Sequence, residues 1–225
     1  MTDILFLKKR QIGHNTWEFI FQPKQPIQYA SGQYIDVFTL RLLDDPRGQS
    51  RTFSLTSTPV DDFISFATFT PENPSPFKEL LLALQPGEAL QASEAMGDMV
   101  LPRLQSTSLV FVAGGLGIAS FISHLKTCER SNLSHPVTLL WALRKLSDAA
   151  DFPVLDTFDF AYRHDYVAPE RVLTSEILAR AGATGMIYVS GSQKFTESIV
   201  AELRALGHPD TRLAFDYFTG YQDIL

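Results

Sequence analysis

Four consecutive residues on one predicted strand, Arg51-Thr52-Phe53-Ser54, combine the groups that could hold a flat ligand carrying a phosphate. Strand alternation places Arg51 and Phe53 on one side and Thr52 and Ser54 on the other. The guanidinium offers a fixed fork of donors to a phosphate, the ring offers a stacking face, and a hydroxyl can hydrogen-bond a ring nitrogen. An ordinary strand with a surface arginine would show the same residues, so this segment alone leaves both interpretations open.

A strand, a glycine turn and a helix follow one another in Val112-Ala-Gly-Gly-Leu-Gly-Ile-Ala119. Gly114, Gly115 and Gly117 would let the backbone approach a pyrophosphate, whose charge the next helix N-terminus favours. The third glycine of the G-x-G-x-x-G pattern is missing, so a tight packing turn is the alternative. A second turn of this kind, at Gly191, lies in Val189-Ser-Gly-Ser-Gln193.

The residues after the second strand of this half bear on which nucleotide is bound. Val137–Ala142 is followed by Arg144 and Lys145, with no acidic residue before Asp148. An acid about 20 residues beyond the glycines would bind the ribose 2′-hydroxyl of NAD, whereas an arginine accommodates the 2′-phosphate of NADP. We therefore expect a slight preference for NADPH, with a solvated basic turn as the alternative.

The elements that must position these residues differ between the two halves of the chain. Before about Pro102, short apolar runs separated by turn residues predict an antiparallel barrel or sandwich. The expected strands are Thr16–Phe21, Gln33–Leu40, Arg51–Leu55, Phe63–Phe69 and Glu88–Gln91, with one helix over Phe77–Leu84 that Ser75-Pro76 would start.

From Ser108 onward, strands alternate with helices, which predicts a doubly wound parallel sheet. The expected strands are Leu109–Ala113, Val137–Ala142, Tyr162–Val167, Met186–Val189 and Arg212–Phe215, and the expected helices are Ile118–Arg130, Asp148–Phe158, Thr174–Ala181 and Phe195–Leu206. The boundary falls near 104–107, so we predict one domain over residues 1–105 and a second over 106–225.

Composition narrows the class of protein. The 225 residues are 45% hydrophobic and 20% charged, which is typical of globular chains, and the net charge of −6 disfavours a nucleic-acid binder. The single cysteine, Cys128, excludes a disulfide framework and a self-contained iron–sulfur cluster. The five histidines show no metal-ligand spacing, so no metal is expected. The segment Met1–Arg10 lacks the charge order of a signal peptide and no apolar run is long enough to span a membrane, so a soluble cytoplasmic protein is expected.

In combination, the order and spacing of these segments resemble the ferredoxin–NADP reductase family. The resemblance runs from about Trp17 to Tyr221, and it includes Gly32-Gln-Tyr34 and the tail Phe215-Asp-Tyr-Phe-Thr-Gly-Tyr221. The chain departs from the family pattern at three places: Ala119-Ser120 replaces a commoner Thr-Pro, Ser190-Gly191-Ser192 replaces Cys-Gly-Pro, and Ser31 replaces a frequent proline. These departures bear on the placement of the nicotinamide.

The resemblance implies a flavin-binding Greek-key β-barrel followed by an NAD(P)-binding α/β domain. It assigns FAD, in preference to FMN, to the segment 51–54, where Phe53 would stack on the ring, Ser54 would bond near N5 and Arg51 would hold the phosphate. The residues that it assigns to cofactor binding are Arg51, Thr52, Phe53, Ser54, Ser75, Phe77, Lys78, Gly114, Gly115, Gly117, Arg144 and Gly191. Ser54, Asp216 and Phe218 would form the reacting centre.

The function implied is hydride transfer from NADPH or NADH to FAD, followed by electron transfer to an external acceptor such as a ferredoxin-type carrier. One alternative is an NAD(P)H:flavin or ferric reductase that takes free flavin as a substrate. Another is a subunit that binds flavin and nucleotide without turnover. No nucleic-acid partner is expected, and the sequence leaves the acceptor and the oligomeric state undetermined.

Overall fold

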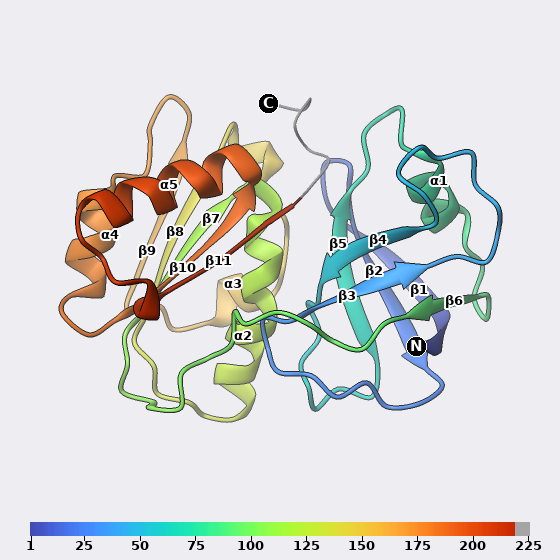
Figure 1. Ribbon diagram of the computed structural model, residues 1–225, viewed down its shortest axis with the longest axis horizontal. Coiled ribbons are helices and arrows are strands. Elements are labelled where there is room, and N and C mark those ends of the chain that lie inside the picture. The colour runs from blue at the N-terminus through green and yellow to red at the C-terminus, as the bar shows by residue number, and fades with distance from the viewer. Residues whose placement is uncertain (219–225) are drawn as a thin grey trace.

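Two sheets, one antiparallel and one parallel, form the computed structural model, which describes residues 1–218 (Figure 1). The strands are β1 (Thr2–Gly13), β2 (Thr16–Pro23), β3 (Tyr34–Phe38), β4 (Ser50–Ser54), β5 (Ile64–Phe69), β6 (Ala89–Ala92), β7 (Leu109–Gly114), β8 (Val137–Leu143), β9 (Tyr162–Val167), β10 (Met186–Ser192) and β11 (Leu213–Phe218). The α-helices are α1 (Pro76–Ala83), α2 (Ala119–Arg130), α3 (Val154–Thr157), α4 (Thr174–Ala181) and α5 (Gln193–Ala205). Three short 3-10 helices cover Gly115–Ile118, Leu146–Asp148 and Asp210–Arg212.

The antiparallel sheet has the strand order β4-β3-β6-β1-β2-β5 and closes on itself. Closure occurs just after β4, where Leu55 pairs with Phe66 of β5 and the amide of Thr56 donates to Ser65 O at 2.7 Å. Phenylalanines fill the interior: Phe66 stacks on Phe53 and Phe21 with ring centroids 4.1 and 5.4 Å apart. The expected antiparallel barrel is confirmed.

The longest strand, β1, was not predicted from the sequence. Its pairing with β2 shifts between Phe6 and Lys8, so the inward and outward positions do not alternate through the whole strand. Leu7 is exposed, and Lys8 and Arg10 also face solvent. A bulged strand with a basic stretch lacks the period of two from which a strand is inferred.

The second sheet is parallel throughout and has the order β11-β10-β7-β8-β9. α2 and α3 pack on one face, and α4 and α5 pack on the other (Figure 1). The predicted doubly wound sheet is confirmed. The predicted helix Asp148–Phe158 is wrong, because only α3 and a preceding 3-10 turn form there. Pro153 disfavours helical backbone before it, and the amide of Asp151 donates to Ile12 O in the barrel.

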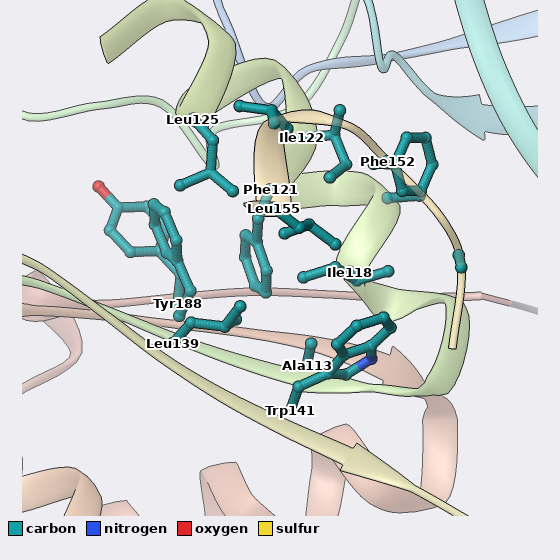
Figure 2. Packing of buried hydrophobic residues seen from close by; sticks show 14 of the residues in the cluster. Ala113, Ile118, Phe121, Ile122, Leu125, Leu139, Trp141, Phe152, Leu155 and Tyr188 are labelled. Carbon is teal, nitrogen blue, oxygen red and sulfur yellow. The ribbon is translucent and has the colours of Figure 1, made fainter. Parts of the chain in front are cut away.

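The core between α2 and the parallel sheet extends into the barrel. Figure 2 shows Phe121, Ile122 and Leu125 of α2 packed over Leu139, Trp141 and Tyr188 of the sheet. Three residues from the barrel half, Ile12, Ala67 and Met99, belong to the same buried cluster. This shared core holds the barrel against the parallel sheet. The predicted boundary at 105/106 falls in the connection between β6 and β7 and stays a prediction.

No helix within residues 1–218 is both long and apolar enough to span a membrane.

Candidate functional site

A cleft of about 480 Å³ opens at the carboxyl ends of the parallel strands. One wall comes from the ends of β7, β8, β10 and β11, and the other from the β1–β2 turn and the end of β5. The lining residues are His14, Asn15, Thr16, Phe69, Gly114, Gly115, Leu116, Ala142, Leu143, Arg144, Lys145, Asp148, Ser192, Phe195 and Phe218. Open α/β sheets bind ligands at this edge, where the strand order reverses, and here the chain reverses between β7 and β10.

The glycines predicted to hold a nucleotide have different surroundings. Gly115 has φ of +53°, and a Cβ built on it would meet nothing within 4 Å. A Cβ on Gly117 would lie 2.1 Å from Ser190 O, and one on Gly191 would lie 2.8 Å from the Phe195 ring. Gly117 and Gly191 therefore serve close packing, whereas Gly115 leaves backbone facing open space in the cleft.

Gly114 lines the cleft but is also held tightly, because a Cβ there would lie 2.7 Å from the Phe195 ring. The turn itself is fixed by Trp141, whose indole N–H donates to Gly115 O at 2.8 Å. This contact was not predicted, since a buried tryptophan on a strand is ordinarily a core residue. It orients Gly115, which leaves room for a ligand in this turn.

Arg144 and Lys145 lie on the lining of the cleft, at the end of β8. The Arg144 side chain is 57% exposed, and its Nε lies 3.9 Å from Asp148 Oδ2. The expected basic edge is therefore present beside the glycine turn, and the acid at 148 folds back towards it. The preference for NADPH stays a prediction.

Four polar side chains join the barrel to the parallel sheet. Ser54 Oγ donates to Asp216 Oδ2 at 3.4 Å, and Ser120 Oγ donates to Ser54 Oγ at 3.2 Å. Ser120 and Ser190 share a hydrogen bond of 3.0 Å between their hydroxyls. The structure thus brings together Ser54 and Asp216, two of the three residues assigned to the reacting centre.

Ser120 and Ser190 were missed as site residues and noted only as departures from the family pattern. Both are fully buried. Burial of Asp216 raises the pKa of its carboxyl above the usual range. The group is therefore protonated more readily than a surface aspartate, at a point where both halves of the chain meet.

Phe218, the third residue assigned to the reacting centre, lies on the cleft wall beside Ser192, with which it pairs across β11 and β10. Its role there stays a prediction. The rest of the predicted tail motif, Thr219-Gly-Tyr221, lies outside the described residues.

In the segment predicted to hold a flavin phosphate, the donors are bound by the side chain of Asp45. Arg51 Nη2 donates to Asp45 Oδ2, and the same oxygen accepts from the amide of Phe77 at 3.4 Å, at the start of α1. The Asp45 side chain is 1% exposed. Burial acts to raise the pKa of this carboxyl, but hydrogen bonds from the Arg47 amide and from Arg51 outweigh it, so the pKa lies below its ordinary value.

The other predicted phosphate and ring contacts are engaged in the fold. Phe53 is 7% exposed and stacks on Phe66, so most of its surface belongs to the barrel core. Thr52 donates to Asp36, and Lys78 Nζ donates to Phe69 O at 2.6 Å. Phe77 is fully buried. None of these contacts tests a role in flavin binding, which stays a prediction.

The residues fit a bound FAD in part. Ser54 presents a hydroxyl where the two halves meet. Within residues 1–218, the buried atoms Arg51 Nε and Ser75 Oγ have no hydrogen-bond partner, as expected where a ligand supplies one. The position of the Asp45 carboxylate is not compatible with a bound flavin phosphate, because it accepts hydrogen bonds from the donors that such a phosphate would need.

No protein-family model matches the chain. The flavohemoprotein of Bacillus subtilis is 23% identical over 236 residues, covering 94% of this chain and 57% of the relative, so this chain spans little more than half of that protein. The NAD(P)H-flavin reductase of Aliivibrio fischeri is 21% identical, covering 89% of this chain and 80% of the relative. The solved ferredoxin–NADP+ reductase of Plasmodium falciparum with 2′P-AMP has a TM-score of 0.81 at 14% identity, covering 96% of this chain and 95% of that chain.

Proposed function

We propose that this chain is a member of the ferredoxin–NADP reductase family and an NAD(P)H-dependent flavoprotein oxidoreductase, as its similarity to flavin reductases and its fold support. FAD is its flavin, and NADPH or NADH is the reductant. The observation that carries the proposal is the cleft at the carboxyl ends of the parallel strands, lined by both halves of the chain and by the open backbone at Gly115. A bound flavin supplies the redox chemistry, because it accepts a hydride and passes electrons on singly or in pairs.

On the nucleotide side, Gly115 lets a pyrophosphate approach the backbone without steric conflict, while the Trp141 indole holds the turn in shape. Arg144 lines the cleft at the end of β8, where its guanidinium would contact a 2′-phosphate. Phe218 lines the same cleft from β11, where its ring would limit access of water to a bound nicotinamide.

On the flavin side, Ser54 and Asp216 would act on the proton that accompanies hydride transfer. Burial raises the pKa of the Asp216 carboxyl, so this carboxyl takes up a proton more readily than a surface aspartate, and its Oδ2 lies 3.4 Å from Ser54 Oγ. Ser120 donates to Ser54 and is itself bonded to Ser190, so Ser120 and Ser190 act as positioning residues.

The acceptor of the electrons lies outside this chain, since one cysteine cannot hold a cluster. We propose an external carrier protein or a small molecule as that acceptor. Free flavin as the acceptor, reduced as a substrate, is the second candidate, and the occupied phosphate segment around Asp45 favours it. We place the protein in the cytoplasm.

The test is an absorption spectrum of the purified protein, supplemented with FAD if it is colourless, before and after NADPH or NADH under nitrogen. Bleaching of the flavin band is expected, and its extent with each nucleotide ranks the two. Flavin present on purification favours a resident cofactor, and its absence favours flavin as substrate. No bleaching, together with no nucleotide oxidation by an artificial acceptor, would contradict the proposal and favour a binding subunit without turnover.

A further inference from the structure

The carboxylate of Asp45 has contacts that a phosphate would otherwise make. Its Oδ2 accepts from Arg51 Nη2 and from the amide of Phe77, the second residue of α1, and its Oδ1 accepts from the amide of Arg47 at 3.0 Å. Guanidinium and helix N-terminal amide donors are the set that proteins present to phosphate groups. The nearby buried atoms Arg51 Nε and Ser75 Oγ have no partner among the described residues.

The loop that carries Asp45 is held in shape by its own hydrogen bonds. The side chain of Gln49 donates to Leu43 O and accepts from the Leu43 amide, both at 3.0 Å, and the amide of Gly48 donates to Asp45 O at 2.9 Å. The side chain of Arg51 is 13% exposed and its guanidinium lies 5.2 Å from the Phe77 ring. Both charges of the pair are therefore held in place by contacts within the chain itself.

A second anion cannot share these donors without repulsion. The Arg51 guanidinium carries one positive charge, and the buried carboxylate of Asp45 already balances it. A phosphate would have to displace Asp45 into solvent or accept a position beside it, and at a few ångströms two negative charges repel strongly where water is largely excluded.

We propose that Asp45 is an internal substitute for the flavin phosphate, so that this chain binds flavins by their ring and ribityl chain and does not distinguish phosphorylated from unphosphorylated forms. The inference rests on the proposed function and narrows its substrate class. A flavin held without its phosphate gains little affinity from Arg51, which suits a flavin that enters and leaves as a substrate.

Riboflavin and FMN test the inference, because they differ only by the phosphate. Their dissociation constants, measured by quenching of flavin fluorescence, are expected to lie within about threefold of each other for the wild-type protein. Asp45→Asn keeps the shape of the side chain and removes its charge, so FMN should bind at least tenfold more tightly than riboflavin to this variant. Asp44→Asn is the matched control at the neighbouring exposed position and should behave as the wild type.

Each outcome decides the matter. A wild-type preference for FMN of tenfold or more would overturn the inference even if Asp45→Asn failed to fold, and so would an unchanged ratio in a folded Asp45→Asn. Failure of every protein to bind either flavin would refute the proposed function itself, and the inference with it. Equal binding by the wild type together with bleaching by NAD(P)H would support both.

Discussion

The stability of the contact between barrel and parallel sheet should depend on pH through one buried histidine. His124, on α2, is fully buried, with Nε2 2.8 Å from Met99 O and Nδ1 3.1 Å from Ser120 O. A Cβ built on Gly32 of the barrel half would lie 2.2 Å from this ring, so the two are in close contact. Burial lowers the pKa of His124 to about 4, although the two carbonyls favour the charged form.

The sign and size of the effect follow from proton binding. Between about pH 6.5 and 4 the unfolded histidine binds a proton and the folded one does not, so stability is fully present above that window and is lost as the pH falls through it. The gap between 6.5 and about 4 corresponds to about 3 kcal/mol in full, of which roughly 2 kcal/mol falls between pH 7 and pH 4.5.

Urea unfolding of the wild type, His124→Gln and His14→Gln at pH 7 and pH 4.5 measures this term. His124→Gln should be less stable at pH 7, because it loses packing against Phe111 and Tyr188, whose rings lie 5.5 and 5.7 Å away. Its further loss on acidification should be roughly 2 kcal/mol smaller than that of the wild type. The exposed control His14→Gln should follow the wild type. Parallel acid losses in all three proteins would refute the assignment of this term to His124.

Three further changes test the cleft. Gly115→Asn keeps a backbone that asparagine tolerates at positive φ but fills open space, so NADPH affinity should fall at least tenfold by titration. The control Gly207→Asn, which is also at positive φ but lies away from the cleft, should leave NADPH affinity unchanged. Arg144→Ala should raise the KM for NADPH several-fold and leave that for NADH nearly constant in steady-state assays; equal effects on both would remove Arg144 from phosphate recognition. Phe218→Ser should change nucleotide KM or kcat while the melting temperature stays within a few degrees, and a large fall in melting temperature with normal kinetics would make Phe218 a packing residue instead.

The hydrophobic periods and the order of the elements in the sequence were enough to predict most of the fold. Period-two runs in the first half and the strand–glycine–helix order in the second predicted a barrel followed by a parallel sheet, because burial of one face imposes those periods on neighbouring residues. Gly115 was singled out because glycines between a strand and a helix let the backbone approach a pyrophosphate, and the structure shows positive φ at that glycine. β1 was not predicted because its bulge breaks the period of two. The predicted helix over Asp148–Phe158 is wrong because Pro153 disfavours helical backbone before it.

The tertiary structure alone decided which polar groups meet. Ser54 and Asp216 are 162 positions apart, and only closure of the barrel against the sheet brings their oxygens within 3.4 Å. Asp45 lies only six residues before Arg51. This spacing does not predict that the Asp45 carboxylate accepts hydrogen bonds from the Arg51 guanidinium and from the start of α1. Periodicity reports which side of an element is buried, whereas the partner of a buried charge depends on loops and packing that have no period.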